Sequence, residues 1–343
     1  MYLQIFVSSF IVFLTLFFLF KKSRLLNDNV EISKHKKLVF SKSSPIIIGG
    51  IYLLIIIFFY FPDHLLKLKI IGLLILSLGL FSDKNVISNP TIRFIIQIII
   101  LFSFVLIEDL YIKSVSVQIL DDLLSNHIFN IFFTVFCFAI LINGSNFLDG
   151  LNILTSGYFL LVLIFLIFLN SQFDIRFDYI DEVKILIIAL SIFVFFNLFG
   201  YCYLGDGGVY LLSTIIGFIL INLFNSNVYI SPYFIVLLLW YPAFENLFSL
   251  TRRLLYLKTK VSNPDKLHLH QLIYRYFILK KTFNKKILNS FTSLIILIYN
   301  LLIFSISIKY FSHTKTLLAL IILNLIVYIL LYNFLSKKFV SKK

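Results

Sequence analysis

The fold class is decided by three neighbouring segments: IFNIFFTVFCFAILI (128–142), NGSNFLDGLN (143–152) and LTSGYFLLVLIFLIFLN (154–170). Allowing for a few residues of error at each end, both apolar runs have the character of membrane helices. The string between them is polar, and amides and carboxylates at the ends of membrane helices are costly to keep without a use. The stretch therefore predicts two spans joined by a functional segment.

The whole chain has the same character. Of its 343 residues, 60% are hydrophobic and only 13% are charged, and the mean hydropathy is +0.99. A soluble domain has too little interior to bury this much apolar surface. We therefore predict an all-α polytopic membrane protein with a single membrane-embedded domain over residues 1–343. Cys137 and Cys202 lie in apolar runs and are expected to be buried thiols.

Hydropathy places about eleven transmembrane helices along the chain, the first a retained helix without a cleavage site. They cover approximately 3–20, 45–61, 70–82, 92–107, 128–142, 154–170, 184–200, 209–224, 232–250, 287–308 and 317–335. With the N-terminus outside and the C-terminus cytoplasmic, the inner segments hold 23 of the 30 Lys and Arg residues. The two longest outer loops are instead acidic. This bias follows the positive-inside rule and supports the orientation.

The net charge of +14 follows largely from this orientation and needs no nucleic-acid partner, since no soluble basic domain exists to carry one. The same orientation brings the polar strings to the cytoplasmic side. We expect the active-site loops to be 21–44, 82–93, 143–153, 201–208 and 251–286.

Three aspartates on this side are the candidate catalytic residues: Asp83, Asp149 and Asp206. Asn146, Asp149 and Asn152 have the i, i+3, i+6 spacing of one stripe at a helix start, and could hold a magnesium ion or sugar hydroxyls. In Gly205-Asp206-Gly207-Gly208, before a helix expected near Val209, glycines would let backbone N–H groups approach a phosphate. Helix capping, or a solvated helix end for Asp83, is the alternative interpretation of these residues.

The basic loop 251–286 holds His268 and His270, two residues apart, with Arg252, Arg253 and Lys266. Guanidinium and imidazole N–H groups donate to phosphate oxygens, which favours a pyrophosphate site. Two histidines without a third ligand make a weaker case for zinc, and a solvated basic loop beside lipid headgroups is the remaining alternative.

In their order along the chain, these motifs resemble the polyprenyl-phosphate N-acetylhexosamine-1-phosphate transferases, which belong to glycosyltransferase family 4 and include the phospho-MurNAc-pentapeptide transferase. The resemblance covers about Lys34 to Leu272. It rests on Gly49-Gly50-Ile51, Gly79-Leu80-Phe81-Ser82-Asp83 with Arg93 and Gln97, Asn146/Asp149-Gly150-Leu151, Gly205-Asp206, Pro242, Glu245, Arg252-Arg253, and Pro264-Asp265 with His268-Leu269-His270.

The resemblance implies transfer of sugar-1-phosphate, GlcNAc-1-phosphate or a related HexNAc-1-phosphate, from a UDP-sugar to undecaprenyl phosphate, with release of UMP. It implies Mg²⁺, with Mn²⁺ as an alternative, held by Asp206 and Asp83 together with Asp149. The implied substrate-binding residues are Lys36, Asn146, Asn152, Arg252, Arg253, His268 and His270. The implied location is the bacterial inner membrane, with a cytoplasmic active site, and a homodimer is compatible with it.

The chain departs from the family pattern at three site positions, and Pro45 also lies one residue further from Gly49-Gly50 than expected. Ser82 stands where an aspartate is usual, Asn152 where an aspartate is frequent, and Gln271 where a third histidine is expected. The absence of three consecutive histidines favours the branch that starts O-antigen, teichoic acid or other surface polysaccharides. A lipid or solute transporter or flippase is the alternative function, and a ligand-free membrane scaffold is a third.

Overall fold

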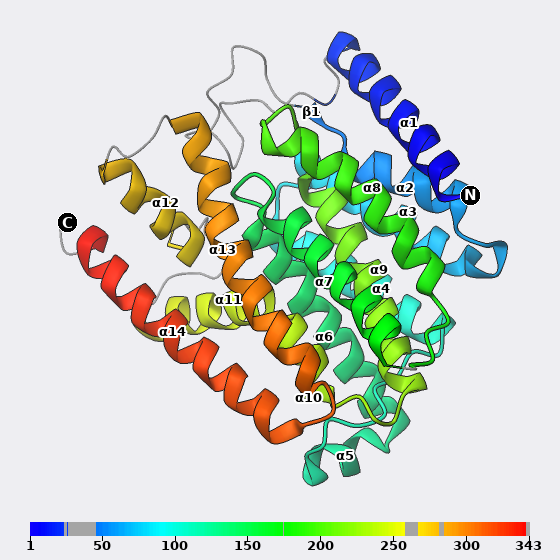
Figure 1. The fold of residues 1–343 in the computed structure, drawn as a ribbon, viewed down its shortest axis with the longest axis vertical. Helices are drawn as coiled ribbons and strands as arrows, with labels where there is room; N and C mark the ends of the chain where they lie inside the picture. The colour runs from blue at the N-terminus through cyan, green and yellow to red at the C-terminus, as the bar shows by residue number, and fades with distance from the viewer. Residues whose placement is uncertain (24–25, 27–45, 174, 258–266, 281–284, 341–343) are drawn as a thin grey trace.

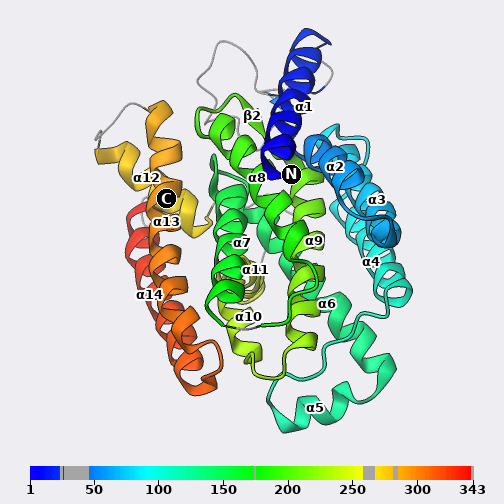
Figure 2. The ribbon, with the colours of Figure 1, turned by 45° about the vertical axis from the view of Figure 1, so that its right-hand side comes forward.

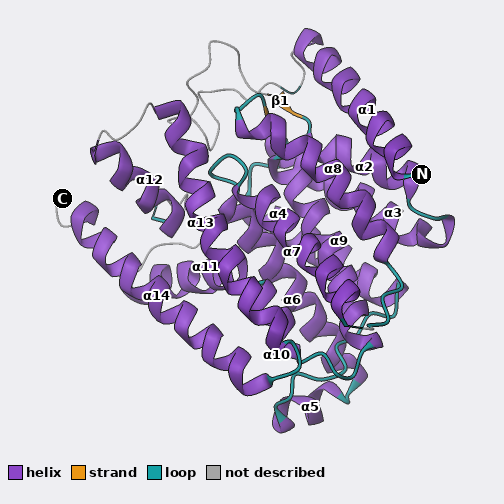
Figure 3. Cartoon of the chain, in the orientation of Figure 1, coloured by secondary structure: helices purple, strands orange, loops and turns teal. Residues whose placement is uncertain are grey.

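The computed structural model describes residues 1–23, 26, 46–173, 175–257, 267–280 and 285–340. Helices make up nearly all of the described chain, with two short strands near one end (Figure 3). The helices are α1 (Tyr2–Ser23), α2 (Gly49–Tyr60), α3 (Leu66–Asp83), α4 (Pro90–Ile107), α5 (Gln118–Leu124), α6 (His127–Leu148), α7 (Leu154–Gln172), α8 (Ile180–Leu198), α9 (Gly205–Ser226), α10 (Pro232–Leu238), α11 (Trp240–Thr251), α12 (Leu269–Lys280), α13 (Lys285–Ser307) and α14 (Thr314–Val340).

The prediction of an all-α polytopic membrane protein is confirmed. Within the described residues, eight helices are long and apolar enough to cross a membrane, namely α1, α3, α4, α6, α7, α9, α13 and α14. The pair α10–α11 bends by 74° and is a ninth candidate, either a broken span or a re-entrant segment.

All eleven predicted spans coincide with helices, but two of them fall short of a full span by length and composition. Helix α2 has 12 residues, and α8 carries Asp181, Glu182 and Lys184 in its first turns. The prediction of eleven spans therefore exceeds the number found among the described residues, where eight helices, or nine with the bent pair α10–α11, are long and apolar enough to cross a membrane.

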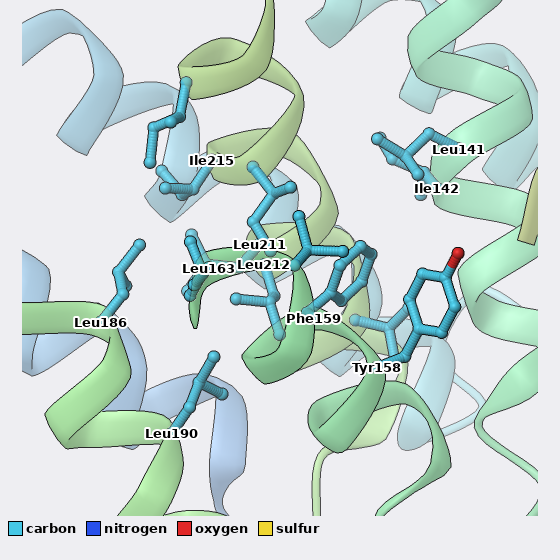
Figure 4. Close-up of a cluster of buried hydrophobic side chains, with 14 of the residues drawn as sticks. Leu141, Ile142, Tyr158, Phe159, Leu163, Leu186, Leu190, Leu211, Leu212 and Ile215 are labelled. Carbon is cyan, nitrogen blue, oxygen red and sulfur yellow. The ribbon is translucent and has the colours of Figure 1, made fainter. Parts of the chain in front are cut away.

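Helix α9 lies at the centre of the bundle, where it packs against α2, α3 and α6 (Figures 1 and 2). In the most hydrophobic 18-residue stretch of α9, 83% of the residues are buried. The same share is 17% in α1 and 22% in α14. The buried side chains of Leu163 on α7, Leu186 on α8 and Leu211 on α9 face one another there (Figure 4). The peripheral helices instead expose apolar side chains, as expected of surfaces covered by lipid.

Glycines let three helices approach one another at the start of α9. A Cβ atom on Gly79 of α3 would lie 2.3 Å from the Cα atom of Gly207, and one on Gly50 of α2 would lie 2.7 Å from the Cα atom of Gly208. Small residues permit such close backbone packing between membrane helices. The glycines of the 205–208 string are thus in contact with neighbouring helices.

A short parallel pairing joins two distant segments at the same end of the bundle. Strand β1 (Ile46–Ile47) precedes α2, and β2 (Cys202–Tyr203) precedes α9; Ile46 pairs with Cys202 and Ile47 with Tyr203. The pairing fixes the starts of α2 and α9 beside each other.

The Gly79 contact gives a stability prediction. Gly79→Ala should lower the free energy of unfolding by roughly 1–3 kcal/mol, because the new methyl group meets the backbone of α9 and the helices must separate. Thermal unfolding of the detergent-solubilised protein measures this loss.

Gly72→Ala on the same helix is the matched control. Its Cβ atom would meet two side-chain ends, the Cδ1 atom of Leu211 at 2.9 Å, which can move aside, and the Cδ1 atom of Leu54 at an ordinary contact distance of 3.7 Å. Equal losses in the two variants would contradict the close α3–α9 packing.

Candidate functional site

Helices α3, α6, α8 and α11 end where α4, α7 and α9 begin, and this end of the bundle carries the candidate residues. Asp83 ends α3 and Asp206 is in the first turn of α9. The structure brings these two aspartates together, as the sequence predicts. The helix begins at Gly205 and not near Val209, because Gly205 to Gly208 form its first turn.

Asp83 acts as a cap for α9. Its Oδ1 atom accepts a hydrogen bond from the backbone N–H of Asp206 at 3.0 Å, and its Oδ2 atom accepts one from Gly207 at 3.3 Å. A carboxylate is stabilised at a helix start because the backbone N–H groups there lack helical partners and carry partial positive charge. Gly205 has a φ of +75°, and a Cβ atom on it would lie 2.7 Å from Oδ2 of Asp83. This approach requires glycine.

The side chain of Asp206 is held by Ser82 and Arg93. Its Oδ2 atom accepts a hydrogen bond from the Ser82 hydroxyl at 2.7 Å and is paired with the Arg93 guanidinium at 3.2 Å. Arg93 also donates to Ser82. The carboxylate is 3% exposed, so a charged partner offsets much of its burial cost. Asn89 caps α4 with Pro90 at the first position, and this start places Arg93 one turn into the helix.

Two carboxylates at one helix start are a donor set that fits magnesium. This ion is usually held by one or two carboxylates, with water and substrate phosphates completing the shell. Within the part of the chain that the structure describes, no group of three or more His, Cys, Asp or Glu side chains is placed to hold a metal ion. The expected grouping of Asp83, Asp149 and Asp206 around one ion is therefore not preformed, and the metal roles of Asp83 and Asp206 stay predictions.

Asn146, Asp149 and Asn152 do not share one helical stripe, and the expectation that they open a helix is wrong. Helix α6 continues through Asn143 and Asn146 to Leu148, Asp149 is its C-cap, and Asn152 lies in the turn before α7. Segment 143–148 contains no residue that ends a helix. Position 144 needs glycine, because a Cβ atom there would lie 2.0 Å from the Pro242 carbonyl oxygen of α11. The left-handed conformation of Ile153 (φ 56°) starts the new helix direction.

Hydrogen bonds tie the turn 149–153 to the segment that leads into α9. The backbone N–H of Ile153 donates to Oδ1 of Asn197 at 2.5 Å, and Nδ2 of Asn197 donates to the Cys202 carbonyl at 2.7 Å. Asn152 is bound to α13, through its N–H to Asn289 at 2.7 Å and its side chain to Ser290 at 3.4 Å. Asp149 and Asp206 therefore lie at the same end of the bundle.

A second cluster forms around Glu245 of α11. Its Oε1 atom lies 2.9 Å from Nδ1 of His268, and its Oε2 atom accepts a hydrogen bond from the Tyr328 hydroxyl at 2.8 Å. Glu245 is completely buried and His268 is 4% exposed. A buried carboxylate paired with imidazole and phenol is the kind of arrangement that orients a functional histidine.

The two histidines lie side by side against the turn that carries Asp149. The rings of His268 and His270 are nearly parallel, with centroids 5.7 Å apart, and Phe147 stacks on His268 at 4.8 Å. A Cβ atom on Gly150 would lie 3.3 Å from Nε2 of His270. The histidine segment and the Asp149 turn are thus adjacent, as a shared site requires.

The two arginines are buried and contact protein groups. Arg252 donates to the Leu267 carbonyl and to the Tyr332 hydroxyl, and the Arg253 guanidinium lies 5.7 Å from the centre of the Phe147 ring. Arg252 therefore holds the segment that leads into His268, and the substrate-binding roles of both arginines stay predictions. Lys36, together with the rest of 27–45 and with Lys266, lies outside the described residues.

Six residues at these contacts had no site role predicted from the sequence: Ser82, Arg93, Phe147, Glu245, Tyr328 and Tyr332. Glu245 had a detectable signal, because it is the only acidic residue in its apolar segment 232–250. The asparagine–proline pair before α4 similarly marks a helix start that projects Arg93 toward α3. The two tyrosines of α14 had no such signal, since Tyr328 is 83 positions away from its partner Glu245 and Tyr332 is 80 positions away from its partner Arg252.

Comparison with known proteins gives one family match. Residues 65–224 match the family model described as glycosyl transferase family 4. This region runs from the start of α3 to the end of α9 and contains Asp83, Asp149 and Asp206. No curated protein matches the chain significantly.

The Arg93–Asp206 pair gives a second stability prediction. Arg93→Gln should lower the free energy of unfolding by about 1–3 kcal/mol, because it removes a cation that is paired with a buried carboxylate. Arg176→Gln is the control, since its pair with Asp178 is exposed and should contribute almost nothing. Denaturation in detergent compares them, and an Arg93 effect as small as the control would refute the pairing.

Proposed function

We propose that this protein transfers GlcNAc-1-phosphate or a related HexNAc-1-phosphate from a UDP-sugar to undecaprenyl phosphate. The match of residues 65–224 to glycosyl transferase family 4 supports a polyprenyl-phosphate sugar-1-phosphate transferase in general. UMP is the second product. The reaction is the first membrane step of cell-surface polysaccharide synthesis, of O-antigen or a similar polymer.

The observation that carries the proposal is the meeting of Asp83 and Asp206 at the start of α9. A helix start and two carboxylates from different helices suit a cation with its bound diphosphate. The turn with Asp149 and the segment with His268 and His270 lie at the same end and offer groups for sugar and phosphate oxygens.

In the proposed reaction, an oxygen of the lipid phosphate attacks the β-phosphorus of the UDP-sugar. The bond from that phosphorus to the bridging oxygen breaks, and the bridging oxygen leaves on UMP. A phosphate monoester has a second pKa of about 6, so near pH 7 the lipid phosphate is mostly dianionic and needs no base. Serine at position 82, where relatives are expected to have aspartate, is compatible with this scheme.

The protein's remaining task is to position two anionic substrates and balance their charge. Magnesium held by Asp83 and Asp206 would neutralise diphosphate charge. His268, His270 and Arg253 would donate to phosphate or sugar oxygens, and Asn146, Asp149 and Asn152 would line the nucleotide-sugar side. The basic inner segments, Lys36 among them, support a cytoplasmic site on the bacterial inner membrane, where UDP-sugars are available.

The bent pair α10–α11 favours a transporter as the second candidate, because transporters use broken helices around buried charges. However, the charged group on this pair, Glu245, is hydrogen-bonded to His268 and belongs to the cluster beside the Asp149 turn. Flux of a lipid-linked sugar across proteoliposomes without covalent change would support transport over transfer.

Purified protein with UDP-GlcNAc, undecaprenyl phosphate and Mg²⁺ should release UMP and form a lipid-linked sugar phosphate detectable by mass spectrometry. Asp206→Asn should lower the rate on the order of 10²-fold, as expected when preorganised charge stabilisation is lost. Asp178→Asn, at an exposed pair, should act like the wild type. Undiminished transfer by the Asp206 variant would rule out its assigned role.

Magnesium binding can be followed without turnover. If Asp83 and Asp206 hold the ion, Mg²⁺ at 100 times its dissociation constant should stabilise the wild type by about 2.7 kcal/mol. The same titration on Asp206→Asn should give a much smaller thermal shift, and Asp178→Asn should retain the full one. A shift that is identical in all three proteins would place the ion elsewhere.

A further inference from the structure

We propose that the hydroxyl of Tyr328, on the C-terminal helix α14, is a positioning group for the transferase site: it fixes Glu245, and Glu245 fixes the ring of His268. Tyr332, one turn further along α14, holds the adjoining residue Leu267 through Arg252. The inference rests on the proposed function and deepens it. It brings into the site a helix that lies beyond the family-matched residues 65–224.

The first support is the geometry around Glu245. Each of its carboxylate oxygens has its own partner, His268 Nδ1 on Oε1 and the Tyr328 hydroxyl on Oε2. A carboxylate held at both oxygens has a fixed plane, and a fixed carboxylate sets the orientation of the imidazole bonded to it. The carboxylate also favours the tautomer of His268 that carries its proton on Nδ1. Nε2 is then the ring nitrogen that does not contact Glu245.

The second support is the way the Tyr328 ring is itself held. It packs edge-on against Phe244, with centroids 4.9 Å apart, and against Phe248 at 5.2 Å, both on α11. The ring of Tyr332 lies parallel to it at 6.3 Å. Packing therefore anchors the aromatic ring independently of its hydroxyl, so a phenylalanine would fill the same space.

The third support is that two positions on α14 converge on two consecutive residues of one segment. Tyr328 reaches His268 through Glu245, and Tyr332 accepts a hydrogen bond from Arg252, which also donates to the Leu267 carbonyl. Residues four apart on a helix lie on one face, so a single face of α14 holds both contacts. His268 in turn stacks on Phe147, two residues before Asp149.

The position of these tyrosines in α14 argues against incidental packing. Only 22% of the most hydrophobic window of α14 is buried, so most of this helix is covered by lipid. Tyr328 is nevertheless 1% exposed and turns its hydroxyl toward a completely buried carboxylate. Removing one partner from such a group leaves the carboxylate less satisfied and its orientation less defined.

The kinetic test compares Tyr328→Phe with Tyr299→Phe, which also lacks one hydroxyl in the α13–α14 pair. The Tyr299 hydroxyl donates to Asn324, one turn before Tyr328. We expect Tyr328→Phe to lower kcat about tenfold with KM for the UDP-sugar changed less than about threefold, since misplacing a group mainly affects the reacting geometry. Tyr299→Phe should keep the wild-type kcat. Equal kcat values in the two variants at similar thermal stability would overturn the proposal.

A second measurement reads the position of His268 without activity. Deuterium exchange at the histidine ring carbon, followed by mass spectrometry, should be slow at buried His268 and fast at exposed His127 in the wild type. In Tyr328→Phe the exchange at His268 should accelerate severalfold, whereas in Tyr299→Phe it should not change. An unchanged His268 rate in Tyr328→Phe would overturn the inference even with an active enzyme. A wild type without transfer activity but with the expected exchange pattern would instead refute the proposed function alone.

Discussion

The start of α9 is held by a carboxylate from another helix, and the geometry of the candidate site depends on that contact. Asp83 accepts hydrogen bonds from the N–H groups of Asp206 and Gly207, which in a membrane protein have little water to bind. The contact needs the backbones of α3 and α9 to be almost touching, and Gly79 opposite Gly207 allows this. The glycine packing therefore sets the distance between the two aspartates before any ligand binds.

The remaining site residues are connected to this point through a series of contacts. Strand β2 leads into α9, Asn197 links β2 to the turn with Ile153, and Gly150 in that turn meets His270. The histidine segment is held in turn by groups from α11 and α14 that lie beyond the family-matched residues. The aspartates thus come from the matched region, and the groups that orient the histidines come from outside it.

The sequence was sufficient for the fold class, because apolar composition and the distribution of Lys and Arg are properties of the whole chain. It also indicated that Asp83 and Asp206 share one end. It failed where polar residues continue a helix: Asn143 and Asn146 resemble a loop in sequence, but packing against α11 keeps them in α6. It was equally unable to find the pair of Glu245 and Tyr328, because that contact exists only after the bundle forms.

Serine at position 82 makes sense in terms of charge. A second aspartate there would place a third carboxylate near one arginine, and like charges at this distance oppose one another's ionisation. With serine, Asp206 is paired with the Arg93 cation and accepts a hydrogen bond from a neutral donor, and Asp83 lies at the partial positive charge of the α9 start, about half a unit. These contacts offset part of the negative charge of the two carboxylates. A diphosphate with two negative charges and a divalent cation adds no net charge, so such a site favours the two together over either one alone.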